Sequence, residues 1–256
     1  MFDWSQKVVF ITGASSGIGR ALAIVLGKRG ASVGLVARRG ETLQEIANEI
    51  ESSGGHALVL PADVTDAAAV RSAADLLREK FGHIDILIAN AGVAGLSDAK
   101  HLNPGDVAHV VHTNVIGAVN SVAAVLPEML ERNSGQLVAM SSLAAYRGLP
   151  KSGAYCASKA ALSAFFESAR LDLRETKIDV TIIHPGFIKT PLTAGRHNKM
   201  PYLMELDDGI RKIVRAIEAR RKSCSFPWQL ATIARLGMLM PVAMYDRLMA
   251  KRSYRE

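Results

Sequence analysis

The fold of this chain is decided by KVVFITGASSGIGRALAIVL, residues 7–26. Residues 8–11 form an unbroken apolar run, as expected for a β-strand that is covered on both faces. A turn with three glycines follows, and the apolar periodicity of a helix begins after it. Glycines let the backbone approach a diphosphate closely, and a helix N-terminus favours its negative charge. Strand, turn and helix therefore predict a dinucleotide site of the spacing G-x-x-x-G-x-G, although an ordinary tight turn can carry the same glycines.

The rest of the chain repeats this order of strand and helix. We expect strands at 7–12, 32–37, 56–60, 84–89, 136–141 and 178–183, a short last strand near 224–226, and helices at 17–29, 41–53, 66–80, 105–132, 153–175, 207–222 and 228–250. Alternating units of this kind indicate a parallel sheet. The chain is thus predicted to be α/β, with one Rossmann-like, doubly wound parallel sheet flanked by helices. Its 256 residues, 49% of them hydrophobic, suit a single domain over residues 1–256.

A second motif, Tyr155-Cys156-Ala157-Ser158-Lys159, carries the chemistry. Positions i and i+4 share a helix face, so the Lys159 ammonium is expected near the Tyr155 phenol. A fixed cation lowers the pKa of a phenol from about 10, which makes it usable as a general acid or base. Ser142, at the end of a predicted strand, can donate a hydrogen bond to a substrate oxygen that gains charge. This is the chemistry of a carbonyl reductase, but the Tyr-x-x-x-Lys spacing alone also fits a solvated helix face.

Taken together and in this order, the motifs resemble the short-chain dehydrogenase/reductase family from about Lys7 to Leu192. The resemblance implies catalytic roles for four residues, Asn114, Ser142, Tyr155 and Lys159. Asn114 falls where the family has an Asn whose carbonyl holds a water beside the Lys. It also implies the cofactor contacts, which are Gly13, Ser15, Ser16, Gly17, Ile18, Gly19, Asp63, Val64, Asn90, Ala91, Gly92, Tyr155, Lys159, Pro185, Gly186, Ile188 and Thr190. The one departure is Ala89, where the family's N-N-A-G segment begins with Asn.

The choice of cofactor is predicted from Ala37-Arg38-Arg39, at the end of the second strand. A site for NAD places a carboxylate there to bind the ribose 2′-hydroxyl, whereas NADP needs cations for its 2′-phosphate. Arg38 and Arg39 supply guanidinium groups, which can meet a phosphate through two parallel hydrogen bonds. We therefore expect NADP(H) to be preferred over NAD(H). The alternative is that both arginines simply flank the next helix in solvent.

The substrate side of the sequence is less specific. The expected lid, residues 187–206, contains Leu192, Met200, Tyr202, Leu203 and Met204 interleaved with Arg196, His197 and Lys199. Apolar residues on a mobile flap favour a hydrophobic substrate, but they can equally be the packing of the flap itself. Alternatively, the basic residues of this lid can bind an acidic carrier of the substrate, such as a phosphopantetheine thioester. A lipid-like ketone, a steroid, a retinoid and an acyl thioester all remain open.

The predicted function is that of an NADP(H)-dependent oxidoreductase that interconverts a carbonyl and an alcohol on a hydrophobic substrate. The alternatives are a 3-oxoacyl-thioester reductase, or a non-catalytic NADP(H)-binding sensor or scaffold, which would be expected to lack the Tyr or the Lys. A nucleic-acid binder ranks last despite the net charge of +7, because residues 1–208 sum to −1 and no stacking aromatics are interleaved with the bases. No histidine spacing predicts a metal site. The two cysteines lie far apart, which suggests a reducing compartment and a cytoplasmic protein.

The resemblance also implies a homodimer or homotetramer built on the helices 105–132 and 153–175. No run looks both long and uncharged enough to span a bilayer. The apolar C-terminal helix expected at 228–250 has Arg235 as its only charge up to Tyr245, and residues 209–256 sum to +8. We therefore expect this C-terminal segment to rest on a membrane surface or on an apolar partner, and a peripheral membrane contact would use residues 228–256. The alternatives are that this helix folds over the substrate cleft or is buried in a subunit interface.

Overall fold

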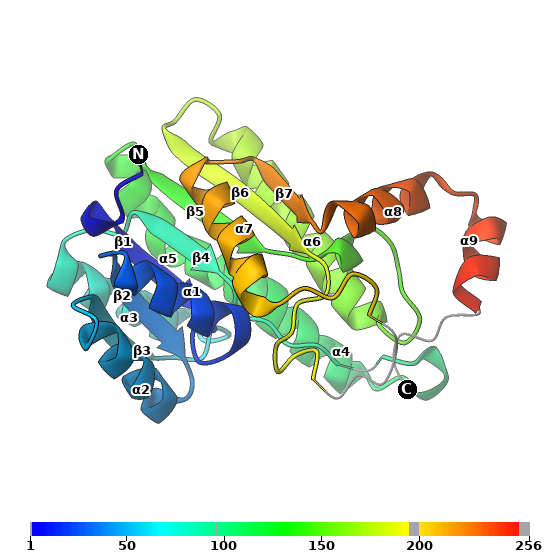
Figure 1. The fold of residues 1–256 in the computed structure, drawn as a ribbon, viewed down its shortest axis with the longest axis horizontal. Coiled ribbons are helices and arrows are strands. Elements are labelled where there is room, and N and C mark those ends of the chain that lie inside the picture. The colour runs from blue at the N-terminus through cyan, green and yellow to red at the C-terminus, as the bar shows by residue number, and fades with distance from the viewer. Residues whose placement is uncertain (1, 96, 195–199, 251–256) are drawn as a thin grey trace.

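Seven parallel strands form the centre of the molecule in the computed structural model, which describes residues 2–95, 97–194 and 200–250 (Figure 1). They are β1 (Val8–Thr12), β2 (Ser32–Ala37), β3 (His56–Pro61), β4 (Ile86–Ala89), β5 (Gly135–Met140), β6 (Ile178–Pro185) and β7 (Ser223–Phe226). Their order in the sheet is β3-β2-β1-β4-β5-β6-β7, and every neighbouring pair is parallel. The expected doubly wound α/β fold is confirmed.

The strand order changes direction at β1, which pairs with β2 on one side and with β4 on the other. Chain connections leave in opposite directions from such a point, so a crevice opens outside the carboxyl ends of the strands. The glycine turn after β1 and the segment after β4 both lie at this edge. The topology alone therefore brings the first motif of the sequence next to residues 90–92.

Helices cover both faces of the sheet. On one face, α1 (Gly17–Lys28), α2 (Gly40–Glu51) and α7 (Leu206–Glu218) pack through a core that includes Leu22, Ile46 and Ile213. On the other face, α3 (Ala67–Phe81), α5 (Gly117–Glu131) and α6 (Gly153–Asp172) pack through a core that includes Leu77 and Phe166. Three short 3₁₀ helices, at Trp4–Gln6, Ala99–His101 and Leu143–Ala145, were not expected from the sequence.

The helix expected at 105–132 contains a break in its hydrogen-bond pattern. It consists of α4 (Pro104–Val111), a π-helical turn (His112–Ile116) and α5. By length and composition, the stretch Pro104–Glu131 could cross a membrane, so the expectation that no run passes this test is wrong. The apolar residues of α5 nevertheless have another use, because Val122, Val125 and Met129 are buried against the sheet.

The single helix expected at 228–250 is wrong. The segment forms two helices, α8 (Trp228–Leu239) and α9 (Val242–Ala250), which project from the end of the sheet near β7 (Figure 1). The break falls at Met240, whose ψ of 133° is extended rather than helical. Pro241 explains it, because proline disfavours the helical conformation in the residue before it and supplies no N–H.

The helix expected at 207–222 ends four residues early, at Glu218. The chain then turns through Arg220, which has a left-handed φ of +47°. The expected lid is tied at its base by a bridge between Ile188 and Met204. Its residues Arg196, His197 and Lys199 lie outside the described part of the chain.

Candidate active site

The glycine turn after β1 lets a ligand approach the protein backbone closely. Gly13 and Gly17 have φ of +68° and +54°, a conformation that side chains with a Cβ rarely adopt. A Cβ on Gly13 would stand 2.7 Å from the Cα of Ala91. Helix α1 begins at Gly17, and no acidic residue occupies its first turn. The free N–H groups of that first turn and the helix dipole make this an anion site.

Asn90 fastens this turn to the segment after β4. Its Nδ2 donates to the carbonyl oxygens of Thr12, at 2.9 Å, and of Gly13, at 3.3 Å. The hydroxyl of Thr12 accepts in return from the backbone N–H groups of Asn90 and Ala91, both at 3.1 Å. The predicted site residue Asn90 therefore shapes the cleft by holding two loops together.

Gly19 has a packing role beneath the turn. It does not line the cleft, because it is buried beneath the turn. A Cβ there would stand 2.3 Å from the Gly13 oxygen and 2.4 Å from Asn90 Nδ2. The third glycine of the motif is therefore needed for close packing of α1 under the turn, and its cofactor contact stays a prediction.

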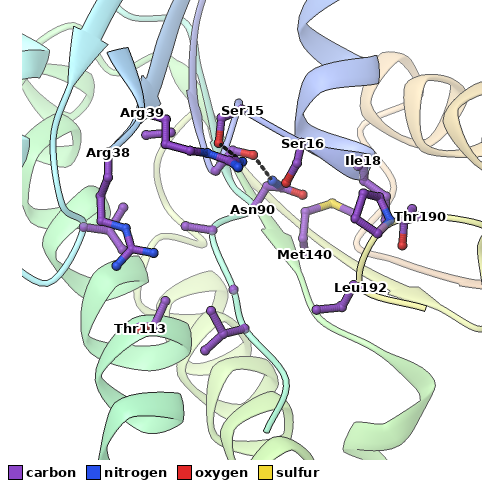
Figure 2. Close-up of a pocket in the computed structure, with 18 of the residues that line it drawn as sticks. Ser15, Ser16, Ile18, Arg38, Arg39, Asn90, Thr113, Met140, Thr190 and Leu192 are labelled. Carbon is purple, nitrogen blue, oxygen red and sulfur yellow. Dashed lines mark hydrogen bonds between the residues drawn. The ribbon is translucent and has the colours of Figure 1, made fainter. Parts of the chain in front are cut away.

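Arg38 and Arg39 both line the cleft at the end of β2 (Figure 2). Arg39 Nη2 donates to Ser15 Oγ at 3.0 Å, which brings it over the glycine turn. Arg38 Nη1 lies 4.0 Å from Asp63 Oδ2, with both side chains largely exposed. The backbone N–H of Thr65, followed by its hydroxyl and by the Arg38 charge, holds the pKa of Asp63 below its usual value despite partial burial. Asp63 thus stays ionised beside Arg38.

Lys159 is buried at the base of the cleft. Its Nζ donates to the carbonyl oxygen of Met140 at 2.8 Å and lies 5.8 Å from the centroid of the Tyr155 ring. Burial lowers the pKa of Lys159 to about 8. A Cβ at Gly92 would stand 3.3 Å from this nitrogen. The expected pairing of Lys159 with Tyr155 on one helix face is therefore present, and Gly92 makes the space for it.

Asn114 lies in the π-helical turn and is fully buried, so its side chain does not line the cleft. The side-chain amide accepts from Val93 N at 2.7 Å and donates to Val93 O and to Ser158 Oγ, each at 2.9 Å. It therefore links the loop after β4 to helix α6. The geometry assigns the side chain of Asn114 to holding the loop, apart from any role of its carbonyl.

Two cavities meet at Tyr155. The polar cleft has a volume of about 530 Å³ and is lined by the glycine turn, Arg38, Arg39 and Lys159. The second cavity, of about 580 Å³, is lined mainly by apolar side chains and by Ser142. Tyr155 and Ser141 line both. Gly186 and Ile188, expected at the cofactor, line only the second cavity, whereas Pro185 and Thr190 line both.

Ser142 stands at the start of the 3₁₀ helix Leu143–Ala145 and accepts from Ala144 N at 3.1 Å. Its hydroxyl can donate to the Pro185 oxygen, but that contact is long, at 3.4 Å. Because the bond is weak, the Ser142 proton can turn to an oxygen in the apolar pocket. Ser142 thus lines only the apolar pocket, Lys159 only the cleft, and Tyr155 both.

The far wall of the apolar pocket comes from α8 and α9, and Arg147 holds it in place. Arg147 Nη1 donates to the carbonyl oxygens of Gly237 and of Met240, the latter at 2.9 Å. The guanidinium lies 3.9 Å from the centroid of the Tyr245 ring, and the Tyr245 hydroxyl donates to Gly148 O at 2.6 Å. We call this set of contacts the Arg147 clamp. Neither Arg147 nor Tyr245 belongs to a motif, and sequence reasoning missed both.

A polar network lies beneath the two cavities. Ser141 and Ser163 both donate to the Lys159 oxygen and lie 2.7 Å apart. Ser163 Oγ lies 3.2 Å from His184 Nε2, and the His184 ring stacks on Tyr146 of the apolar pocket. Nδ1 of His184 has no partner among the described residues. Burial, with a contribution from Arg235, lowers the pKa of His184 to about 4, so its ring is neutral near pH 7.

The cleft also includes residues that the motifs did not single out, namely Ala37, Ala62, Val93, Thr113, Met140, Ser141, Pro191 and Leu192. Most of them adjoin a predicted site residue or end a strand at the same edge of the sheet. The rule that ligands bind at the carboxyl ends of parallel strands would have found several of them. Thr113, in the π-helical turn, carries no such signal.

Comparison with known proteins agrees with this architecture. The family model for short chain dehydrogenases matches residues 7–201. An uncharacterized oxidoreductase of Myxococcus xanthus (strain DK1622) is 43% identical over 246 residues, which are 96% of this chain and 97% of that protein. The chain therefore belongs to the short-chain dehydrogenase/reductase family, as the motifs predicted, and it is an oxidoreductase by class.

Two solved structures are similar throughout most of the chain. A 3-ketoacyl-ACP reductase from Sinorhizobium meliloti 1021 has a TM-score of 0.79 and 29% identity, and the match covers 88% of this chain and 99% of that one. A short chain dehydrogenase/reductase from Burkholderia phymatum, in complex with NAD, has a TM-score of 0.86 at 24% identity, over 100% and 99% of the two chains. The second similarity supports the fold.

Proposed function

We propose that this protein is an NADP(H)-dependent oxidoreductase that interconverts a carbonyl and an alcohol on a hydrophobic substrate. The observation that carries the proposal is the position of Tyr155 in the walls of both cavities. A polar cleft suited to a dinucleotide and an apolar pocket suited to a hydrophobic molecule meet at one phenol. A substrate carbonyl at this boundary would lie within reach of Tyr155 and Ser142.

The residues of the chain divide the acid–base work. In the reductive direction Tyr155 donates its hydroxyl proton to the carbonyl oxygen, and Ser142 donates a hydrogen bond to the same oxygen. Lys159, held by Met140, keeps a positive charge beside the phenolate that forms. In the oxidative direction Tyr155 is the base. A bound nicotinamide would supply or accept the hydride.

The cleft fits a nicotinamide dinucleotide, and its charge favours the phosphorylated form. The positive φ of Gly13 and Gly17 and the start of α1 suit the diphosphate. The Arg38–Asp63 contact is long and exposed, so it holds Arg38 weakly, and a 2′-phosphate can replace Asp63 as its partner. Arg39 lies close by, over Ser15. An enzyme that preferred NAD would need an acid where these cations stand.

The apolar pocket supports a substrate with a long hydrocarbon part. Its described walls include leucine, isoleucine, methionine and tyrosine side chains, and Arg147 is the one charged residue among them. A 3-oxoacyl thioester is the second candidate, favoured by the likeness to the Sinorhizobium meliloti 3-ketoacyl-ACP reductase. A non-catalytic sensor is less well supported, because Tyr155 and Lys159 are both present and both at the cleft.

For assembly, we propose a homodimer or homotetramer that uses α5 and α6, together with a cytoplasmic location. Leu130 on α5 and Leu171 on α6 are large apolar side chains that remain exposed. Both cysteines are free thiols, as suits a reducing compartment. Light scattering at micromolar concentration tests the assembly, and a strictly monomeric mass would contradict it.

The test of the function is NADPH oxidation with carbonyl substrates grouped by chain length and head group. We expect turnover to rise with chain length for simple ketones and aldehydes. Faster turnover of 3-oxoacyl thioesters than of free ketones of equal length would favour the second candidate. Tight NADPH binding without turnover of any carbonyl or alcohol would support the sensor instead.

A further inference from the structure

The most exposed apolar side chains of the described chain gather on α8 and α9. Leu239 is 82% exposed, Trp228 72% and Val242 68%, and no other large apolar residue among those described reaches these values. Met238 and Met244 are more than half exposed as well. None of these five residues lines the apolar pocket. We call these five residues the outer face of α8 and α9.

Helix α8 carries large apolar side chains on two opposite sides, and the outer side also bears Thr232 and Arg235. Leu230, Ala234 and Gly237 share one side by their spacing of three and four residues, and they line the apolar pocket. Trp228 and Leu239, eleven residues apart, share the opposite side with Arg235. A helix that only closed a pocket would need one apolar side. The second apolar side therefore indicates a second contact.

The outer face continues into the mouth of the apolar pocket. Ile233, Leu236 and Leu248 line that pocket and are each at least 40% exposed. Tyr202, from the other side of the pocket, is also exposed. The exposed lining residues of the pocket thus lie on α8, α9 and residues 201–202, where the mouth is expected. Helices α8 and α9 are the part of the molecule that projects from the sheet (Figure 1).

Charge decides what covers this surface. From Trp228 to Ala250 the charged residues are Arg235, Asp246 and Arg247, all exposed, and residues 251–256 add three bases and one acid. A second copy packed on the face across a two-fold axis would bring these bases against their own copies. Anionic lipid head groups would instead attract them, and an exposed tryptophan suits the boundary between head groups and acyl chains.

We propose that the outer face of α8 and α9 lies on an anionic membrane surface, with the mouth of the apolar pocket open to the lipid. The membrane contact stands on the exposed residues and their charge, and the entry of substrate from the lipid rests on the proposed function. The helices are too short and too interrupted to span a bilayer, so the contact is a surface one.

The test is co-sedimentation of the full chain with phosphatidylcholine vesicles, with and without phosphatidylglycerol. We expect binding to the anionic vesicles at low salt that weakens as salt rises. Leu239→Glu should lower the fraction bound about tenfold or more, because it places a charge in the contact. Leu76→Glu is the matched control, since Leu76 is an exposed leucine on α3, and it should bind like the native chain.

Equal binding by both variants, or no binding by the native chain, would overturn the proposal. If the native chain stays in the supernatant and Leu239→Glu lowers its mass in light scattering, a second copy covers the face instead. The entry route has its own readout: Leu239→Glu should slow turnover of a long-chain ketone held in vesicles but not of a short soluble ketone. If Leu239→Glu slows turnover of the two ketones equally, the entry route is wrong. If the native protein turns over neither ketone, the proposed function is refuted, and the sedimentation experiment still decides the membrane contact.

Discussion

The polar cleft draws most of its walls from the turns that follow β1, β2, β3 and β4, whereas the apolar pocket draws most of its walls from segments outside the sheet. Residues 143–149, 186–193, 201–202 and 230–249 contribute most of the described part of that pocket. The cleft is therefore set by backbone geometry that the sheet fixes. The pocket is set by side-chain contacts between segments far apart in the sequence.

This difference teaches where the protein can change and where it cannot. A Cβ added at Gly13 or Gly19 would meet backbone atoms, so the cleft tolerates little variation. The pocket depends on the Arg147 clamp and on α8 and α9, which lie outside the sheet. The cofactor side and the substrate side should therefore respond separately to substitutions, except at the residues where they meet.

Tyr155→Phe should have the largest effect, because it acts at that meeting point. Loss of the hydroxyl removes the proton donor and should lower kcat by about 10² to 10⁴. NADPH affinity, measured by fluorescence titration, should stay nearly unchanged because the ring remains in the cleft wall. A variant that kept a tenth of the native rate on a good substrate would show that the acid is another group.

His184 lies in the polar network beneath the two cavities, and its lowered pKa predicts how the stability of the protein depends on pH. Its pKa is about 4 in the folded protein against 6.5 in an unfolded chain, so the unfolded chain binds more protons between these values. Stability should therefore fall as the pH drops from about 6.5 to 4, by about 3 kcal/mol from this residue. Urea unfolding across this window should show a smaller loss for His184→Asn. If the free energy of unfolding fell equally with pH in the native protein and in His184→Asn, the assignment to His184 would be wrong.

Arg38→Asp should alter the cleft alone. The native protein is expected to bind NADPH at least about tenfold more tightly than NADH, since a charged hydrogen-bond pair can supply about 1.4 kcal/mol. The substitution should shrink or reverse this preference without changing the chain-length profile of the substrates. Arg71→Asp, on the exposed side of α3, is the matched control. Equal affinity of the native protein for the two cofactors would refute the assignment.

Arg147→Met should alter the pocket alone, and by the smallest factor. The variant loses the bonds to Gly237 and Met240 and the stacking on Tyr245, so α8 and α9 should loosen. We expect KM for long-chain substrates to rise about three- to tenfold, with NADPH affinity unchanged. Trypsin should also cleave faster at Arg247. Arg174→Met, at an exposed position after α6, is the control and should change neither KM nor the rate of cleavage. An equal loss of NADPH affinity in Arg147→Met would show that the cofactor side and the substrate side do not respond separately.

Much of the fold and most of the cleft were predictable from local patterns. The strand, glycine turn and helix of residues 7–26 fix a βα unit, and alternation fixes the parallel sheet. Tyr155 and Lys159 had to share a helix face because of their spacing alone. The contacts that the sequence did not predict are those where a neighbour in space decides the packing, as for Gly19 under Asn90 and for the Asn114 side chain beside Val93.

The sequence by itself therefore determined the class of fold, the glycine turn after β1 and the shared helix of Tyr155 and Lys159, because these depend on backbone conformation and on short spacings. Only the tertiary structure decided that the segment 228–250 is two helices that wall an apolar pocket, and that Arg147 holds them there. Contacts between residues about 90 positions apart leave no periodicity in the chain. They arise because the sheet brings the end of β5 and the end of β7 to the same edge, where a guanidinium can reach the carbonyl oxygens that end a helix.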